Sequence, residues 1–287
     1  MDSTIIMNVY GFIGYSLCKS LLNSGCEVKG LVPEPCRPGT GAEEKQMEIG
    51  RNANYSETEC EDWYSDKMIN KSKLIIPFFD FYMLGTEKSL TENASLKSCL
   101  RRNAEYLRIS LVLPCRLLFD KASRDETIMP FLEFLQNNRI VVQEIYVPTF
   151  YGQWQPEEYF FHQLIKNPET TRKELAPHER EETMDAIFLE DAMEQILPLL
   201  KMENGRFLLK SSDPNAWRDC ALSLTEPDGM CKAAGVGMDW PIGIEKVKAA
   251  DVLDAETVIV QKKQDYRKGL QLQQEYYEFL KKKREKA

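Results

Sequence analysis

The stretch Asn8–Gly14, NVYGFIG, decides the fold of this chain. It follows a β-rich run at residues 4–9 and opens an apolar segment whose large side chains recur at helical spacing as far as residue 23. Ser24-Gly25 then stops the helix, and residues 27–32 form a second β-rich run. The sequence therefore predicts a strand, a helix and a second strand at its start.

The spacing of glycines in this stretch is that of a dinucleotide-binding turn with one glycine replaced. Such a turn uses three glycines, so that the strand turns tightly, the backbone approaches a pyrophosphate and the helix packs closely on the sheet. Gly11 and Gly14 hold the second and third places, and Asn8 stands in the first. Asparagine tolerates a positive φ, so the turn can form, but its side chain would crowd a pyrophosphate. The candidate cofactor contacts here are Asn8, Gly11, Phe12, Ile13 and Gly14.

Composition excludes several classes of protein. The chain has 287 residues with 45 acidic and 37 basic side chains, and its net charge of -8 argues against a nucleic-acid partner. It has no apolar run of about 18 residues and no signal-peptide pattern, so we expect no membrane contact and a cytoplasmic location. Eight cysteines without Cys-x-x-Cys spacing and only two histidines predict reduced thiols and no metal site.

Strands and helices alternate as far as residue 147, which predicts a parallel sheet. Later strands are expected at 73–79, 107–113 and 140–147, with a weak strand at 47–50 and an acidic helix at 57–66. The predicted fold class is α/β, a Rossmann-like doubly wound parallel sheet with a small C-terminal α+β domain of the substrate-binding type. We place the sheet in residues 1–150, with 183–200 returning to it, and the smaller domain in 151–182 and 201–287.

The order of motifs resembles the extended short-chain dehydrogenase/reductase family, the NAD-dependent epimerases and dehydratases. Residues 11–14 look like its first glycine turn, and residues 147–152, VPTFYG, are similar to its "R-P-x-x-x-Y-G" turn. Residues 185–192, DAIFLEDA, look like its "D-F-I-H-V-D-D-V-A" segment, and residues 266–270 are similar to the start of its terminal helix. The resemblance covers nearly the whole chain. It implies a seven-stranded Rossmann sheet, NAD or NADP, nucleotide-sugar substrates, and often dimers.

The catalytic part of this pattern is missing. The family uses a Tyr-x-x-x-Lys pair, in which the lysine lowers the tyrosine pKa for proton exchange with a substrate hydroxyl. Residues 120–138 should carry the pair, yet they contain no tyrosine and only Lys121 as lysine. Cys115 stands near the place of the catalytic Ser/Thr, where a thiol is a poor substitute for a hydroxyl. Cys115 and Tyr151 are weak catalytic candidates, and Tyr106 is a further substitute acid.

The cofactor side also departs from the pattern. Val32 stands where the family often has an acid for the ribose hydroxyls. Glu34 could replace that acid and Arg37 could favour a 2′-phosphate, or both are solvated loop charges. Phe78 and Phe79 fall where the family has alanines, at the end of the fourth strand. Their rings could fill the cofactor cleft, or the register is off by one and one ring points into the core.

Two hypotheses follow for function. The first is a catalytically inactive member of the fold, a pseudoenzyme that serves as a binding or interaction scaffold. Its ligand would lie around Tyr151, Trp154 and residues 167–182, and its partner, a small molecule or a protein, is not identified; a homodimer is allowed. The second is an active NAD(P)-dependent oxidoreductase or epimerase with substituted catalytic groups. No cofactor is assigned, and NAD or NADP can bind only if the cleft is open.

Overall fold

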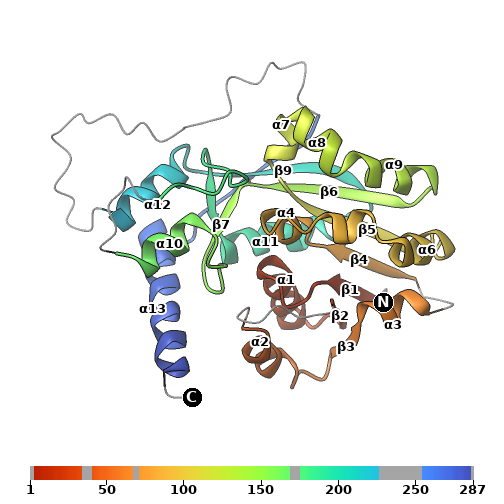
Figure 1. Cartoon of the computed structure of the whole chain (residues 1–287), viewed down its shortest axis with the longest axis horizontal. Helices are drawn as coiled ribbons and strands as arrows, with labels where there is room; N and C mark the ends of the chain where they lie inside the picture. Colours follow the sequence, from red (N-terminus) through yellow and green to blue (C-terminus); the bar gives the residue numbers. More distant parts are fainter. Residues whose placement is uncertain (1–2, 34–40, 67–70, 169–174, 226–253, 286–287) are drawn as a thin grey trace.

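The computed structural model describes residues 3–33, 41–66, 71–168, 175–225 and 254–285 (Figure 1). Glu34 and Arg37, the two candidate ribose and phosphate contacts, lie outside the described residues. Part of the expected 167–182 ligand loop lies outside them too. Among the described residues, no helix combines the length and the apolar character that a membrane crossing requires.

The centre of the molecule is an eight-stranded sheet in which all neighbours are parallel, in the order β10-β9-β6-β5-β4-β1-β2-β3. Its strands are β1 (Ser3–Met7), β2 (Val28–Val32), β3 (Tyr55–Glu59), β4 (Ser72–Ile76), β5 (Leu107–Pro114), β6 (Val141–Val147), β9 (Gly205–Ser211) and β10 (Glu256–Val260). The order reverses between β1 and β4, as it does in doubly wound sheets. The predicted α/β, Rossmann-like fold class is therefore confirmed.

Helices cover both faces of this sheet (Figure 1). On one face α1 packs against α11, and on the other α6 lies beside α9, because Lys97 and Arg101 of α6 sit over the Phe134 ring. The helices are α1 (Phe12–Asn23), α2 (Ala42–Ile49), α3 (Cys60–Ser65), α4 (Phe78–Met83), α5 (Lys88–Thr91), α6 (Ala94–Arg102), α7 (Arg116–Phe119), α8 (Lys121–Thr127), α9 (Met129–Asn137), α10 (Phe160–Lys166), α11 (Leu189–Leu199), α12 (Ala216–Thr225) and α13 (Tyr266–Arg284).

Four expectations about the elements are wrong. Residues 47–50, expected as a strand, end helix α2, and β3 occupies part of the expected acidic helix, of which only α3 is helical. β3 is an edge strand that pairs with β2 alone, so its glutamates stay in solvent. An exposed edge strand can therefore have the acidic composition that we expected of a solvated helix. The sheet has eight strands instead of seven. β9 and β10, placed in the smaller domain by the boundary at residue 201, extend the main sheet instead.

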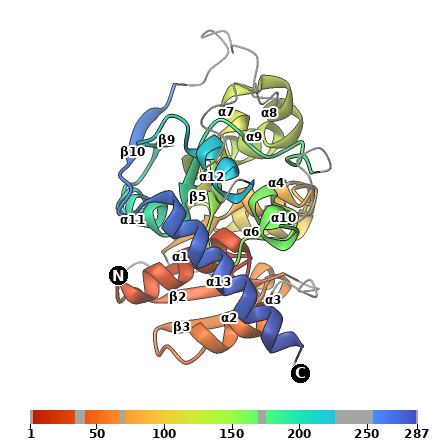
Figure 2. The ribbon, with the colours of Figure 1, turned by 90° about the vertical axis from the view of Figure 1, so that its left-hand side faces the viewer.

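A second, smaller hydrophobic cluster lies beside the main core. It joins α10, α12 and α13 to a two-stranded parallel sheet of β7 (Thr149–Tyr151) and β8 (Ala186–Phe188). Phe160 and Trp217 stack in this cluster with ring centroids 5.5 Å apart. From this cluster α13 runs across the molecule in front of α1 and α2 (Figure 2), where Lys283 pairs with Glu44 at 3.5 Å. The terminal helix therefore crosses the carboxyl edge of the sheet, beside the glycine turn.

Candidate functional site

The glycine turn between β1 and α1 keeps its shape without the first glycine. Asn8 has a φ of 51°, in the left-handed region that asparagine tolerates, and its carbonyl accepts a 2.8 Å hydrogen bond from Gly11 N. Gly14 lies so close to Asn8 that a Cβ at this position would collide with the Asn8 carbonyl oxygen. Asn8 therefore substitutes for glycine in the backbone, and Gly14 allows the close helix–strand contact that the sequence predicts.

The amino terminus of α1 is occupied by a carboxylate of the chain itself. Asp80, the third residue of α4, accepts hydrogen bonds from Ile13 N at 3.2 Å (Oδ1) and 3.0 Å (Oδ2), and from Gly14 N at 3.3 Å (Oδ2). A Cβ on Gly11 would collide with the same carboxylate. In dinucleotide-binding folds these helix-terminal N–H groups face the pyrophosphate. In this protein the Asp80 carboxylate accepts the hydrogen bonds of these N–H groups instead.

Lys45 of α2 provides a buried positive charge near this carboxylate. Its side chain is only 2% exposed, and its ammonium donates a 2.7 Å hydrogen bond to the Tyr10 carbonyl and lies 5.0 Å from the centre of the Trp154 ring. Burial raises the pKa of Asp80 to about 6, although the Ile13 and Gly14 N–H groups and the charge of Lys45 act to lower it. The turn is thus held from one side by Asp80 and from the other by Lys45.

Sequence reasoning missed both Asp80 and Lys45. Asp80 belongs to the segment FFDF, for which the sequence analysis considered only the aromatic residues, and no role was predicted for Lys45. A charged residue inside an apolar run is the only signal that could have singled out Asp80. Its partner, 67 residues earlier in the chain, becomes visible only when β1 and β4 pair side by side.

Phe78 and Phe79 lie in the core and not in the cofactor cleft. β4 ends at Ile76, and after Pro77 the two residues begin α4, with exposures of 0% and 2%. The Phe79 ring stacks on Phe150, with centroids 6.0 Å apart. Of the two predictions for these rings, the one that places a ring in the core is therefore confirmed, and the prediction that they fill the cleft is wrong.

A cleft of about 920 Å³ lies over the glycine turn. Its floor includes Asn8, Tyr10 and Asp80, and α13 forms its roof with residues 273–281. The wall between floor and roof includes Trp154, Tyr159 and His162. Trp154, which the sequence placed near the ligand, lines this cleft. The site is therefore open to a small molecule, but the amides that would bind an anion at its floor are already paired.

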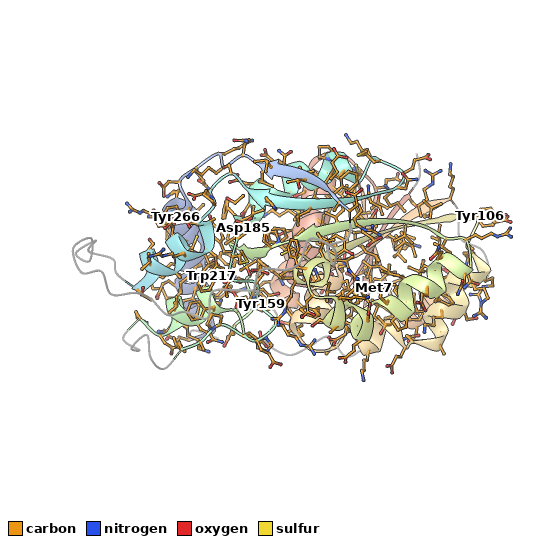
Figure 3. The ribbon with its side chains drawn as sticks, turned by 90° about the horizontal axis from the view of Figure 1, so that it is seen from above. Met7, Tyr106, Tyr159, Asp185, Trp217 and Tyr266 are labelled. Carbon is orange, nitrogen blue, oxygen red and sulfur yellow. The ribbon has the colours of Figure 1, made fainter. Side chains whose placement is uncertain are left out.

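The catalytic candidates are not brought together in this cleft. Tyr151 is 4% exposed, and its ring packs on Phe161 and Phe188 in the second cluster, where burial raises its pKa. Cys115 is 4% exposed, and burial raises its pKa well above the usual range, so the group stays a thiol. Tyr106 precedes β5, at the far end of the molecule from the cleft residue Tyr159 (Figure 3). The structure thus shows no acid–base group assembled from these three.

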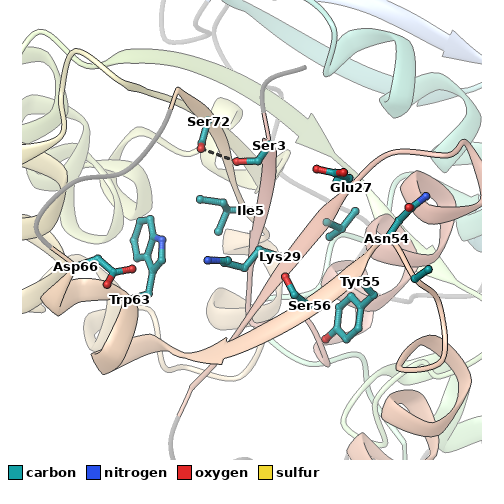
Figure 4. Close-up of a pocket in the computed structure, with 12 residues that line it drawn as sticks. Ser3, Ile5, Glu27, Lys29, Asn54, Tyr55, Ser56, Trp63, Asp66 and Ser72 are labelled. Carbon is teal, nitrogen blue, oxygen red and sulfur yellow. Dashed lines mark hydrogen bonds between the residues drawn. The ribbon is translucent and has the colours of Figure 1, made fainter.

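A second cavity, of about 370 Å³, lies at the amino ends of β1, β2, β3 and β4 (Figure 4). Its lining includes Lys29, Tyr55 and Trp63, and the Ser3 and Ser72 hydroxyls meet beside it at 2.7 Å. Open α/β sheets bind ligands at the carboxyl ends of their strands, which is the opposite edge. The cleft over the glycine turn is therefore the candidate site.

Solved structures of similar fold include an epimerase and two dehydratases. UDP-glucuronic acid 4-epimerase from Bacillus cereus, solved with NAD, is 14% identical with a TM-score of 0.60, and the match covers 96% of each chain. dTDP-glucose 4,6-dehydratase from Bacillus anthracis, also with NAD, is 12% identical with a TM-score of 0.61 and 97% of each chain covered. An NAD-dependent NDP-hexosamine 5,6-dehydratase of tunicamycin biosynthesis is 12% identical, with a TM-score of 0.60. It is covered over 98% of its length and 97% of this chain.

No protein-family model and no curated protein sequence matches the chain. The structural comparisons confirm that the chain has the Rossmann-like fold of the NAD-dependent epimerases and dehydratases. At 12–14% identity they establish the fold and leave the activity to be argued from the site.

Proposed function

We propose that this protein is a catalytically inactive relative of the epimerase/dehydratase fold that works as a small-molecule-binding or interaction scaffold. The observation that carries the proposal is the Asp80 carboxylate on the Ile13 and Gly14 amides. A dinucleotide would have to displace this carboxylate or place its pyrophosphate beside it, where two anions repel in a partly buried site.

The loss of catalytic groups supports the same proposal. Residues 120–138, the segment that should carry the Tyr-x-x-x-Lys pair, contain no tyrosine. The same spacing occurs at Tyr15/Lys19 in α1 and at Tyr277/Lys281 in α13, which are other elements of the fold. The candidates Cys115, Tyr151 and Tyr106 lie apart from one another. A hydride-transfer enzyme needs its cofactor and its proton-transfer group within reach of one substrate atom. Two separate features oppose this chemistry. Asp80 occupies the cofactor position at the floor of the cleft, and the segment after β5 lacks the proton-transfer tyrosine.

A titration with NAD(H) and NADP(H), followed by thermal unfolding, tests this proposal. A cofactor at about 100 times its dissociation constant stabilises a fold by about 2.7 kcal/mol. We expect no stabilisation by any of the four dinucleotides, and no conversion of UDP-sugars when these sugars are added with the dinucleotides. Micromolar dinucleotide binding accompanied by conversion of a UDP-sugar would overturn the proposal.

The alternative is an active NAD(P)-dependent oxidoreductase or epimerase. One observation favours it: the cleft is open beside the glycine turn, in a fold whose solved examples hold NAD. This alternative requires Asp80 to leave the α1 terminus or to be neutral when the cofactor binds. It predicts tighter NAD binding at about pH 5 than at about pH 8, because protonation of Asp80 removes the repulsion.

A further inference from the structure

The strand β10 forms one outer edge of the main sheet, and within the described part of the chain it pairs with β9 alone (Figure 2). After Glu256 the strand reads TVIV, four β-branched residues without a charge. The opposite edge strand, β3, carries Glu57 and Glu59, and charged side chains of this kind discourage edge-to-edge pairing. β10 lacks that protection, so its edge is the one suited to receive a further strand.

The backbone of β10 shows which of its groups face this edge. The Val260 carbonyl accepts a 3.2 Å hydrogen bond from the N–H group of Ser212, which follows β9. Val260 therefore faces β9. Because successive residues of a strand direct their N–H and C=O groups to alternate sides, Thr257 and Ile259 face away from β9. The groups directed at the outer edge are thus the N–H and C=O groups of these two residues.

Exposed charges of opposite sign stand at the two ends of β10. Asp254 and Glu256 lie at its start, and Lys262 and Lys263 follow its end. Both lysines also make ion pairs with acids of their own chain, but ion pairs this exposed are weak. A second β10 running antiparallel would place the acidic start of each strand beside the basic end of the other. A parallel copy would set like charges side by side, which is unfavourable.

We propose that β10 pairs antiparallel with β10 of a second copy of this chain, about a twofold axis at Val258. Thr257 then lies opposite Ile259 of the partner subunit, and the two residues exchange N–H···O hydrogen bonds. Asp254 lies opposite Lys262 of the partner subunit. Ile259, whose apolar side chain is 45% exposed, gains a neighbour across the axis. The contact is self-complementary, as the interface of a twofold-symmetric dimer must be.

Sedimentation equilibrium of the full chain tests this inference. One strand from each copy gives a small interface, so we expect a reversible dimer with a dissociation constant in the micromolar range. Ile259→Lys adds the charge that protects natural edge strands and should weaken the dimer at least about tenfold. Thr257→Pro removes an outward N–H group and should have a similar effect. Met47→Lys, which changes an exposed apolar side chain of α2, should dimerise as the wild type does.

Charge reversal tests the antiparallel arrangement separately. Asp254→Lys sets a lysine opposite Lys262 of the partner subunit and should weaken the dimer. The double variant Asp254→Lys/Lys262→Asp restores opposite charges across the axis, so its affinity should return toward that of the wild type. A double variant as weak as Asp254→Lys alone would contradict the proposed register.

A chain that stays monomeric at about 100 micromolar, or a dimer that neither Ile259→Lys nor Thr257→Pro weakens, would also contradict the inference. Slow hydrogen exchange of the Thr257 and Ile259 amides in a monomer would mean that another part of the same chain covers the edge, which likewise overturns it. Circular dichroism of each variant separates lost pairing from lost folding. The lining of the cleft over the glycine turn contains no residue of β10, so these outcomes leave the function proposed for that cleft to its own test.

Discussion

At the residue scale, Asp80 performs the task that a bound phosphate performs in a working dinucleotide site. Its carboxylate is 4% exposed and satisfies two N–H groups of the first turn of α1, which the helix itself leaves without partners. The positive end of the α1 dipole is thereby neutralised from within the chain. The turn no longer depends on a cofactor to pair its amides.

The ionisation of Asp80 makes stability depend on pH. Its pKa rises from 3.8 in the unfolded chain to about 6 in the folded protein, so stability from this group is complete below pH 3.8 and is lost as the pH rises to about 6. Asp80→Asn stays neutral. We expect the free energy of unfolding of the variant, relative to wild type, to rise by about 3 kcal/mol between about pH 3.5 and pH 7. Urea denaturation at each pH measures it.

The matched control for this pH dependence is Asp62→Asn, an exposed acid in the first turn of α3. The change across this range should be larger for Asp80→Asn than for the control. A flat profile for Asp80→Asn would mean that the charged form of Asp80 is not disfavoured in the fold.

Gly14 provides a second test at this scale. Because a Cβ on Gly14 would collide with the backbone carbonyl of Asn8, Gly14→Ala must push α1 away from β1. We expect a loss of about 1–3 kcal/mol in the free energy of unfolding, as for other overpacked sites. Ser16→Ala, in the same helix, should change it by less than about 0.5 kcal/mol. Equal effects of the two variants would show that the close contact carries no strain.

At the element scale, α13 is the least expected part of the site. Residues 266–270 resemble the start of the family's terminal helix, and in the structure this helix forms the roof of the cleft. Gln273, 3% exposed, holds the helix there: it accepts from Gly152 N at 3.0 Å and donates to Gln155 Oε1 at 2.6 Å. Tyr276 packs edge-on to Trp154 with centroids 4.9 Å apart.

Replacing Gln273 should loosen this roof. Gln273→Ala leaves the buried Gly152 N–H without a partner, which destabilises by about 1–3 kcal/mol. We expect faster hydrogen exchange in residues 273–284 and little change in the main sheet. Gln271→Ala, an exposed neighbour in the same helix, is the control. Equal exchange in both variants would show that Gln273 does not fix the helix.

The elements that the sequence predicted well are those with strong local signals. The β1–α1–β2 unit, β5 and β6 have continuous apolar runs or a helical period bounded by turn residues, and they lie close to where expected. β3 and α2 were misassigned because an edge strand and a half-exposed helix share an acidic, polar composition. β9 and β10 were placed in the wrong domain because strand order depends on long-range pairing.

For the whole molecule, the fold matches that of known enzymes, whereas the residues of the site differ from the catalytic pattern of the family. The eight parallel strands and the solved structures define the Rossmann-like fold, whereas the absence of a Tyr-x-x-x-Lys pair from residues 120–138 was already evident from the sequence. The open cleft, in which Asp80 already pairs the amides at the floor, could not be predicted from the sequence. It forms only when the fold brings Asp80, Lys45 and α13 together from distant parts of the chain.

The central claim is that Asp80 occupies the anion position of the glycine turn, and pyrophosphate affinity tests it most directly. Asp80→Ala removes the carboxylate and frees two buried amides, at a loss in stability of at least about 1–3 kcal/mol. Calorimetric titration with inorganic pyrophosphate should show at least about tenfold tighter binding to Asp80→Ala than to wild type or Asp62→Ala. Asp80→Asn, which keeps the side-chain volume and removes only the repulsion between the anions, should show a smaller gain than Asp80→Ala. Tight pyrophosphate binding to the wild type, or no gain in folded Asp80→Ala, would contradict the account.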